Sequence, residues 1–296
     1  MTDFRSGFVA LIGRPNVGKS TLLNAMLGQK LSIVTPRPQT TRHRVIGIAN
    51  SSEGQIAFVD TPGLHQGQKR ALNRAMNRTA AAALADADLA VLVIEALRFT
   101  AEDRLALERL RESGRPAIAV INKVDQVRPR DRLLPFMATL AASHEFRAIV
   151  PISAQKGDNL EELRRAILAE LPVGVALFPP EQLTDRSERF RIAETIREKL
   201  TLELNEELPY GIAVEIESVQ ENEDGQFEVS AVIWVDRAGQ KPIVIGAGGE
   251  RLKRIGRAAR MELNKLLGKR FHLTLWVKVR EDWADDARAL ALLGME

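Results

Sequence analysis

The sequence predicts an α/β domain followed by a smaller α+β domain, and three observations support this fold class. Short apolar runs alternate with helical stretches from residue 8 to residue 170, which is typical of a mainly parallel sheet with helices on both faces. Prolines between residues 171 and 182 then interrupt the pattern, because proline lacks the N–H that helices and sheets use. Beyond them, two stretches alternate apolar and polar residues around a charged turn, which predicts a β-hairpin.

The first half contains the elements of one domain, which we place at residues 1–172. An apolar run at 8–13 ends in a glycine-rich turn and leads into a helix at 20–27. The further apolar runs that predict strands lie at 56–60, 89–94, 117–122 and 148–153. The helical stretches between them lie at 71–85, 101–113, 132–143 and 160–170. Residues 45–50 are predicted to add a strand antiparallel to 56–60.

The second half predicts a linker at 173–184, a domain at 185–281 and a tail at 282–296. The predicted elements of this domain are a helix at 185–204, strands at 212–219 and 227–235, a basic helix at 250–267 and a strand at 271–280. Its strand aromatics are expected in the core rather than on a base-stacking surface; they are Phe227, Trp234, Phe271 and Trp276. For the tail, we expect a short terminal helix packed on the body.

Composition indicates a globular protein of the cytoplasm. The apolar content of 45% and the charged content of 27% are ordinary for a globular chain. No apolar run approaches the roughly 18 residues of a membrane span, and the polar start shows no signal peptide. The absence of cysteine excludes disulfides, cysteine metal sites and thiol catalysis.

Charge is mild overall but unevenly distributed. The formal net charge is +3, yet residues 239–280 contain eleven Lys/Arg against two Glu. Residues 174–238 contain six Lys/Arg against fifteen Asp/Glu. A segment this basic beside one this acidic indicates a polyanion-binding face, and a solvated helix face is the plain alternative.

Residues 13–20 match the P-loop pattern G-x-x-x-x-G-K-S between a predicted strand and a predicted helix. They are Gly13, Arg14, Pro15, Asn16, Val17, Gly18, Lys19 and Ser20. The glycines allow a tight bend whose N–H groups surround phosphate oxygens, and the helix directs its positive dipole end at the same anion. We predict that Lys19 reaches the β- and γ-phosphates and that the Ser20 hydroxyl ligates Mg²⁺.

A second cluster follows the predicted strand at 56–60. It consists of Asp60, Thr61, Pro62 and Gly63. Asp60 is placed to hold Mg²⁺, through water, and the Gly63 N–H to contact the γ-phosphate. An Asp-x-x-Gly sequence alone is a common turn. Its separation from the P-loop along the chain favours a role in binding the nucleotide and its Mg²⁺.

A third and a fourth cluster predict a preference for guanine. Asn122, Lys123 and Asp125 follow one strand, and Ser153 and Ala154 follow another. Asp125 can accept hydrogen bonds from guanine N1–H and its exocyclic amine, which adenine does not offer, so adenine would leave a carboxylate unpaired. We expect Asn122 to contact the other base edge, the Lys123 stem to cover a ring face, and the Ala154 N–H to bind guanine O6.

These motifs, in this order, resemble the G domains of translation-factor-class GTPases. The resemblance implies that a threonine within 39–43 ligates Mg²⁺ in the GTP state; we favour Thr41, with Thr40 as the alternative. Leu64 stands where Ras-like GTPases carry the glutamine that orients water, which implies slow hydrolysis on the order of 10⁻⁴ to 10⁻² s⁻¹. Asn16 matches an asparagine that coordinates K⁺ in several relatives. The predicted catalytic residues are therefore Lys19, Thr41, Gly63 and Asn16.

A Gly-x-x-Gly loop in the second half predicts RNA binding. In KH domains such a loop clamps about four nucleotides through their backbone. The order helix, strand, strand, helix, helix, strand resembles a type II KH domain. The residues predicted to contact RNA are Gly246, Ala247, Gly248, Gly249, Arg251, Lys253, Arg254 and Arg257. Ala247 and Gly248 are uncharged where a basic residue often stands.

A P-loop G domain joined to a type II KH domain resembles the Era family of bacterial GTPases over nearly the whole chain. The resemblance implies GTP and GDP as ligands, Mg²⁺ as cofactor, and K⁺ as a further candidate. It also implies binding to 16S ribosomal RNA near its 3′ end, a role in 30S subunit maturation, and peripheral association with the inner membrane. Nothing in the sequence requires more than a monomer.

Three alternatives remain open at this point. A relative with two G domains also ends in a KH-like domain, but this chain has one P-loop. A tRNA-modification GTPase places its G domain inside a helical domain, which is not predicted here. A switch at a membrane surface would use the basic residues between 253 and 270 to contact anionic lipid.

Overall fold

The computed structural model describes residues 3–63, 70–204 and 208–294, and its contacts group the chain into two compact units. The first unit consists of Met1–Ser32, Thr41–Gln68 and Asn73–Asp185. The second consists of Ile33–Thr40, Lys69–Leu72 and Arg186–Glu296. Leu64, which stands at the position of the water-orienting glutamine of Ras-like GTPases, lies outside the described residues.

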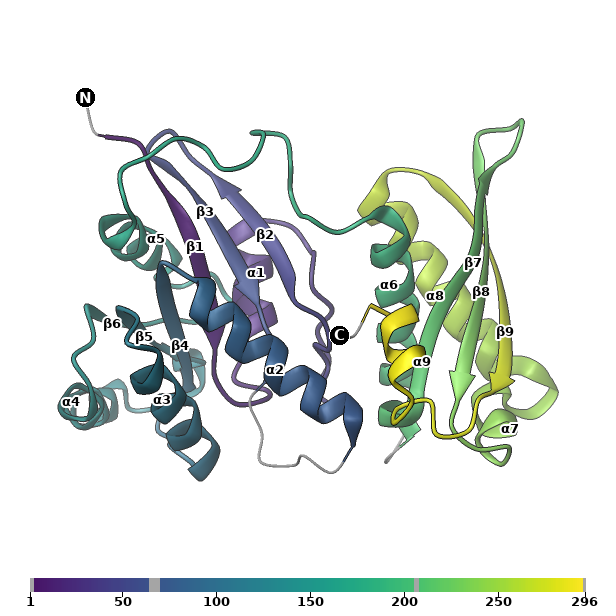
Figure 1. The fold of residues 1–296 in the computed structure, drawn as a ribbon, viewed down its shortest axis with the longest axis horizontal. Coiled ribbons are helices and arrows are strands. Elements are labelled where there is room, and N and C mark those ends of the chain that lie inside the picture. Colours follow the sequence, from purple (N-terminus) through teal and green to yellow (C-terminus); the bar gives the residue numbers. More distant parts are fainter. Residues whose placement is uncertain (1–2, 64–69, 205–207, 295–296) are drawn as a thin grey trace. The chain divides into compact units, whose positions relative to one another are not determined.

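The first unit is built on a six-stranded sheet with the order β2-β3-β1-β4-β5-β6 (Figure 1). The strands are β1 (Arg5–Ile12), β2 (Val45–Asn50), β3 (Gly54–Asp60), β4 (Leu89–Glu95), β5 (Ala117–Asn122) and β6 (Ala148–Pro151). All neighbouring pairs are parallel except β2 and β3, which are antiparallel as predicted. The central parallel strands β4 and β5 are apolar runs buried on both faces, and this explains why they could be located in the sequence.

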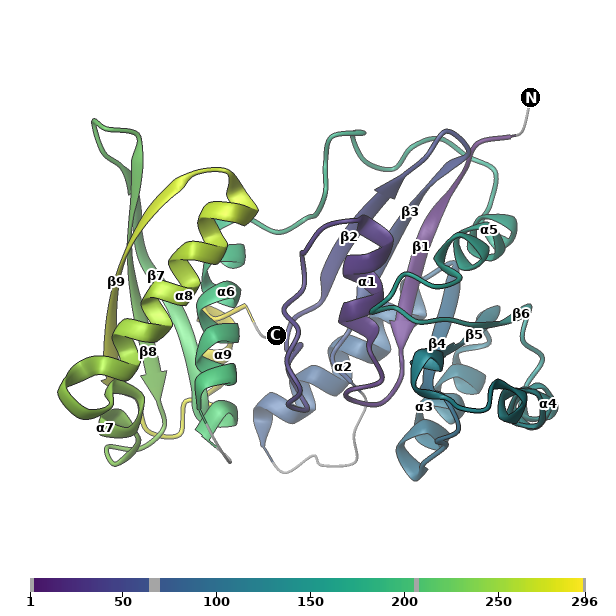
Figure 2. The same cartoon turned by 180° about the vertical axis from the view of Figure 1, so that it is seen from behind.

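Helices cover both faces of this sheet (Figures 1 and 2). They are α1 (Lys19–Leu27), α2 (Ala71–Asp86), α3 (Ala101–Ser113), α4 (Leu133–Ser143) and α5 (Leu160–Glu170). Buried residues of α2, α3 and α4 form one core with β1, β4 and β5. On the other face α1 packs on β2, β3 and α5, and α5 packs on β1. The predicted mainly parallel sheet with helices on both faces is confirmed.

Residues predicted as a linker are fastened to the first unit. Gln55 is completely buried, and its side-chain oxygen accepts hydrogen bonds from the N–H groups of Leu177 and Phe178 at 2.7 and 2.9 Å. The Phe178 ring packs edge-to-face on Phe8 with ring centroids 6.0 Å apart. The Ile48 N–H donates to the Leu183 carbonyl. This segment therefore runs along the antiparallel edge of the sheet and is not a free spacer.

The second unit contains a three-stranded sheet with the order β7-β8-β9. Its elements are α6 (Glu188–Glu203), β7 (Ile212–Glu221), β8 (Gln226–Val235), α7 (Gln240–Ile245), α8 (Glu250–Leu267), β9 (Arg270–Val279) and α9 (Ala287–Leu292). β7 and β8 form the predicted hairpin, and β9 pairs parallel with β8. α6 and α8 pack on the sheet around one apolar core. This element order is the predicted type II KH order.

The aromatic predictions for these strands were half right. Phe227 and Phe271 pack in the core, with ring centroids 5.6 Å apart. Trp234 is only half-buried and bonds Glu215 through its Nε1, and Trp276 is 57% exposed, so both predictions were wrong. Side chains alternate between the faces of a strand, and these even-numbered positions lie on the face opposite α6 and α8.

The tail folds as predicted into a short terminal helix. Trp283, which precedes α9, is completely buried, and its Nε1–H donates to the Gly211 carbonyl at 3.0 Å. Within the described residues, no helix is long and apolar enough to cross a membrane.

Candidate nucleotide site and nucleic-acid interface

The predicted nucleotide motifs meet at one edge of the first sheet because each follows the carboxyl end of a parallel strand. The P-loop follows β1, Asp60 ends β3, Asn122 ends β5, and Ser153 follows β6. Register places Leu11 beside Asp60 in the sheet. In open α/β sheets, ligands bind outside the carboxyl ends of the strands.

The P-loop is bent tightly, and the close approach of a neighbouring side chain requires glycine at position 18. Gly18 has a φ of 101°, and a Cβ there would lie 2.3 Å from Asn122 Nδ2. Lys19 Nζ donates to the carbonyls of Gly13 and Arg14 at 2.9 and 3.0 Å. Burial lowers the pKa of Lys19 to about 8, against an opposing effect of the Asp60 charge. An anionic ligand here would favour the charged lysine.

The three predicted Mg²⁺ ligands converge on one point. Ser20 Oγ lies 2.8 Å from Thr41 Oγ1 and donates to Asp60 Oδ2 at 2.8 Å. Asp60 is completely buried, and its Oδ1 has no hydrogen-bond partner among the described residues. Burial raises the pKa of Asp60, while the Lys19 charge and nearby hydroxyls oppose that rise. An all-oxygen set with an unsatisfied carboxylate oxygen fits a hard divalent cation.

The geometry separates the two threonine candidates. Thr41 faces Ser20, whereas Thr40 Oγ1 pairs with Thr35 Oγ1 at 2.7 Å and donates to the Arg37 carbonyl at 2.7 Å. Thr41, and not Thr40, therefore lies at the cluster of predicted metal ligands.

The Asp-Thr-Pro-Gly turn lies directly against the P-loop. Thr61 Oγ1 donates to the Leu11 carbonyl at 2.8 Å. A Cβ on Gly63 would lie 2.8 Å from the Pro15 nitrogen, so this position has no room for a side chain. Asn16 is an exposed P-loop residue in the left-handed region, with a φ of 63°.

The guanine motif (Asn122, Lys123 and Asp125) is held by hydrogen bonds to the P-loop and to the residues that follow β6. Asn122 Nδ2 donates to the Val17 carbonyl at 2.8 Å, which ties the motif to the P-loop. The Ala154 N–H donates to Asn122 Oδ1 at 3.0 Å, so it is engaged within the protein here. Ser153 Oγ donates to Asp125 Oδ1 at 2.7 Å. Ser153 therefore orients the carboxylate that is predicted to read guanine.

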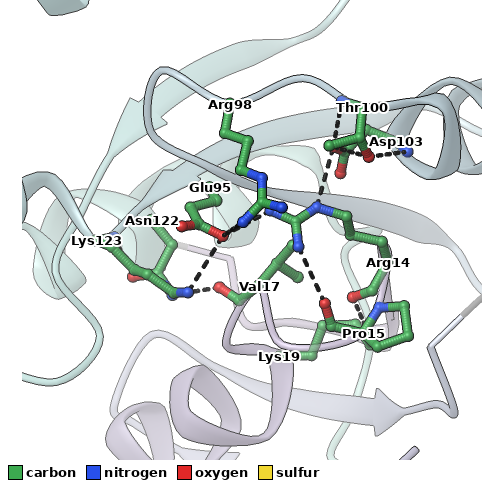
Figure 3. Close-up of polar contacts among 10 residues, drawn as sticks. All are labelled: Arg14, Pro15, Val17, Lys19, Glu95, Arg98, Thr100, Asp103, Asn122 and Lys123. Carbon is green, nitrogen blue, oxygen red and sulfur yellow. Dashed lines mark hydrogen bonds and ion pairs between the residues drawn. The ribbon is translucent and has the colours of Figure 1, made fainter. Parts of the chain in front are cut away.

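Two acidic residues that sequence reasoning missed also lie at this edge (Figure 3). Arg14 donates to Glu95 Oε2 at 2.6 Å and to Asp103 Oδ2 at 3.1 Å. Glu95 ends β4, as Asp60 ends β3 and Asn122 ends β5. Its position after an apolar run was the signal that could have identified it. Asp103 gave no such signal, because an acid in the first turn of a helix is ordinary capping.

The predicted RNA loop joins α7 to α8. Gly246, Gly248 and Gly249 all have positive φ, at 75°, 57° and 79°. A Cβ on Gly246 would lie 2.7 Å from Arg251 Cβ, so glycine is needed there. Ala247 and Gly248 are exposed at the tip of the loop. The loop therefore offers backbone, not side chains, to a ligand.

The predicted basic residues continue along α8 and are not equivalent. Lys253 pairs with Glu250 at 3.0 Å, Arg254 pairs with Glu203, and the Arg251 guanidinium donates to the Ile243 carbonyl. Arg257 is exposed and has no ion-pair partner among the described residues. Among these four predicted cations, Arg257 is thus the most available to a phosphate.

Comparisons with known proteins agree with this geometry. A family described as "50S ribosome-binding GTPase" matches residues 8–123, and a family described as "KH domain" matches residues 207–284. GTPase Era of Stenotrophomonas maltophilia (strain R551-3) is 52% identical over 296 residues, covering 100% of this chain and 99% of that protein. The chain belongs to the Era family of GTPases.

Two solved structures of Era match nearly the whole chain. A tyrosine-to-alanine variant of Aquifex aeolicus Era bound to GDP and AlF₄⁻ is 41% identical, with a TM-score of 0.96 and 99% coverage of both chains. Era in complex with MgGDPNP and nucleotides 1506–1542 of 16S ribosomal RNA gives the same identity, TM-score and coverage.

Proposed function

We propose that this Era-family GTPase binds GTP with Mg²⁺, hydrolyses it slowly, and binds 16S ribosomal RNA near its 3′ end during 30S subunit maturation. The convergence of Ser20, Thr41 and Asp60 on one point carries the nucleotide part of this proposal. The Era complex that contains MgGDPNP and a 16S fragment supports the choice of metal and RNA.

Different residues of the site are proposed to bind the metal, the phosphates and the base of the nucleotide. Ser20, Thr41 and Asp60 would hold Mg²⁺, which when bound neutralises charge on the β- and γ-phosphates. Lys19, protonated below pH 8, would leave the P-loop carbonyls for phosphate oxygens. Gly63, packed on Pro15, would offer its N–H to the γ-phosphate. Asp125, held by Ser153, would select guanine.

The second unit supports a coupling between nucleotide state and RNA affinity. It includes residues 33–40, which immediately precede Thr41. Within this unit, the Arg197 guanidinium donates to the Thr40 carbonyl, and the Val34 N–H donates to Glu198 Oε1 at 2.9 Å. Both side chains lie on α6 and are buried. A shift of Thr41 toward or away from Mg²⁺ would therefore act, through one peptide bond, on a segment held by the RNA-binding unit.

The test of the RNA part is crosslinking to total cellular RNA with a non-hydrolysable GTP analogue or with GDP, followed by sequencing. We expect reads concentrated at the 3′ end of the small-subunit RNA and stronger with the analogue. If the reads were scattered and did not depend on the bound nucleotide, the GTPase assignment would stand and the ribosomal role would be rejected.

A second proposal concerns K⁺, which could supply charge in place of an arginine finger. The exposed position of Asn16 in the P-loop supports it. Replacing K⁺ with Na⁺ should lower turnover in the wild type but not in Asn16→Ala. Equal turnover in both salts would reject K⁺ as a cofactor.

The location proposed for the protein is the cytoplasm, with peripheral attachment to the inner face of the membrane through the basic α8. Flotation with anionic and neutral liposomes after RNase treatment tests this attachment. Binding to anionic vesicles alone is expected, and binding to neither would remove the membrane role.

A further inference from the structure

Glu95 connects the two ends of the proposed nucleotide site (Figure 3). It is the last residue of β4, and register places it beside Asn122, the first residue of the guanine motif. Its Oε2 lies 2.6 Å from Arg14 Nη2 and 3.3 Å from Lys123 Nζ. Arg14 belongs to the P-loop and Lys123 to the guanine motif. One carboxylate oxygen therefore contacts a cation from each.

The P-loop side of this bridge is fixed by a second carboxylate. Asp103 is completely buried, accepts from Arg14 Nε at 3.1 Å, and also accepts from the Thr100 N–H and hydroxyl at 2.8 and 2.9 Å. The Arg14 guanidinium is held between two carboxylates with 6% of its side chain exposed. Charge-assisted hydrogen bonds of this kind are strong and also fix the orientation of the guanidinium group. The Arg14 carbonyl in turn accepts from Lys19 Nζ.

The guanine side of the bridge is held in an unfavourable backbone conformation. Lys123 has a φ of 67°, which costs a residue with a Cβ about 1 kcal/mol or more unless its surroundings fix it. Its N–H donates to Asn122 Oδ1 at 2.8 Å, and its ammonium group contacts Glu95. These two contacts fix both ends of a residue whose stem is proposed to cover the base.

We infer that Glu95 is a positioning residue that sets the P-loop and the guanine motif at the separation required by one guanine nucleotide. It holds Arg14 on the phosphate side and Lys123 on the base side. The inference rests on the proposed nucleotide site and goes beyond its motifs, because Glu95 belongs to none of them. Consistent with the two cationic partners, the pKa of Glu95 lies below its usual value although burial alone would raise it.

The test compares GDP dissociation from the full-length wild type and from Glu95→Gln, using a fluorescent GDP analogue. Removal of a carboxylate that bonds two cations should raise the dissociation rate by about 10- to 100-fold. Arg98→Gln is the matched control, because Arg98 Nη1 lies 4.0 Å from the same oxygen and its side chain is 62% exposed. We expect a change of less than about three-fold for this exposed partner.

A double-mutant cycle separates positioning from general loss of structure. If Glu95 acts through Lys123, Glu95→Gln should raise the rate by less than about three-fold in a Lys123→Met background. The same factor in both backgrounds, or a wild-type rate in Glu95→Gln, would overturn the inference. A wild type that does not bind GDP would instead reject the proposed nucleotide site, so the two failures are distinguishable.

Discussion

In the nucleotide site the charged groups are buried and already bonded to the protein, whereas on α8 they are exposed and weakly held. Lys19, Arg14 and Asp60 are each at most 6% exposed and are fixed by hydrogen bonds within the site. Lys253 and Arg257 lie in solvent, and Lys253 pairs only with an exposed Glu250. The first arrangement suits recognition of one ligand geometry. The second suits a polyanion whose phosphates can be contacted in many ways.

The comparison predicts large, specific losses in the nucleotide site, and the largest is expected at Asp125. Asp125→Asn removes the acceptor for guanine N1–H and amine, so GDP affinity should fall by about 10³-fold or more. Xanthosine diphosphate, which carries a carbonyl in place of that amine, should bind the variant better than GDP. Competition binding with both nucleotides measures this. Asp131→Asn, an exposed change nearby, is the control; an unaltered preference for guanine in Asp125→Asn would contradict the assignment.

A smaller loss is expected at the residues proposed to hold Mg²⁺. Thr41→Ala should weaken binding of a non-hydrolysable GTP analogue by about ten-fold in Mg²⁺, because it removes one oxygen from the cluster with Ser20 and Asp60. Thr40→Ala, whose hydroxyl bonds Thr35 and Arg37 instead, should leave that affinity unchanged. Isothermal titration with and without Mg²⁺ distinguishes the two. If Thr40→Ala weakened binding and Thr41→Ala did not, Thr40 and not Thr41 would be the Mg²⁺ ligand.

The ion pairs of Glu95 with Arg14 and Lys123 should make the free energy of unfolding depend on pH. Because the folded-state pKa of Glu95 is lowered, its contribution is fully present above the unfolded value of about 4.5 and is lost as the pH falls through the folded value. The free energy of unfolding of Glu95→Gln should therefore lie about 1–3 kcal/mol below that of the wild type at pH 7. The difference should shrink below pH 4.5. Urea unfolding measures it, and a difference independent of pH would show that the charge is not involved.

The smallest effect is expected on the RNA face. Arg257→Gln should weaken RNA binding only several-fold and lower the slope of log affinity against log salt by about 0.7 for a single-stranded contact. Lys265→Gln, on the last turn of the same helix, is the control and should change the slope less. A loss of hundreds-fold in Arg257→Gln would show a fixed recognition site in place of distributed charge.

Sequence alone located the elements whose pattern is local. Asp60 and Asn122 were predictable because each ends an apolar run, and Gly18 because its motif is contiguous. Trp276 was misplaced because β-strand periodicity gives two faces without saying which one the helices cover. Gln55 and its bonds to residues 177 and 178 depend on contacts between segments about 120 residues apart, which no local pattern contains.

The nucleotide site was likewise predictable only in part. The residues of its motifs come from the sequence, but the network of Arg14, Glu95 and Asp103 comes from the sheet register and from packing of α3. The grouping of residues 33–40 with α6 is another long-range property. It also gives the coupling proposed here a physical path.

That coupling is tested most directly by titrating one RNA, corresponding to the 3′ end of the small-subunit RNA, into the protein loaded with Mg²⁺ and either a non-hydrolysable GTP analogue or GDP. We expect at least about ten-fold tighter binding with the analogue, which corresponds to a coupling free energy near 1.4 kcal/mol. Equal affinities in the two nucleotide states would contradict it, because a nucleotide that does not change RNA affinity cannot act as its switch.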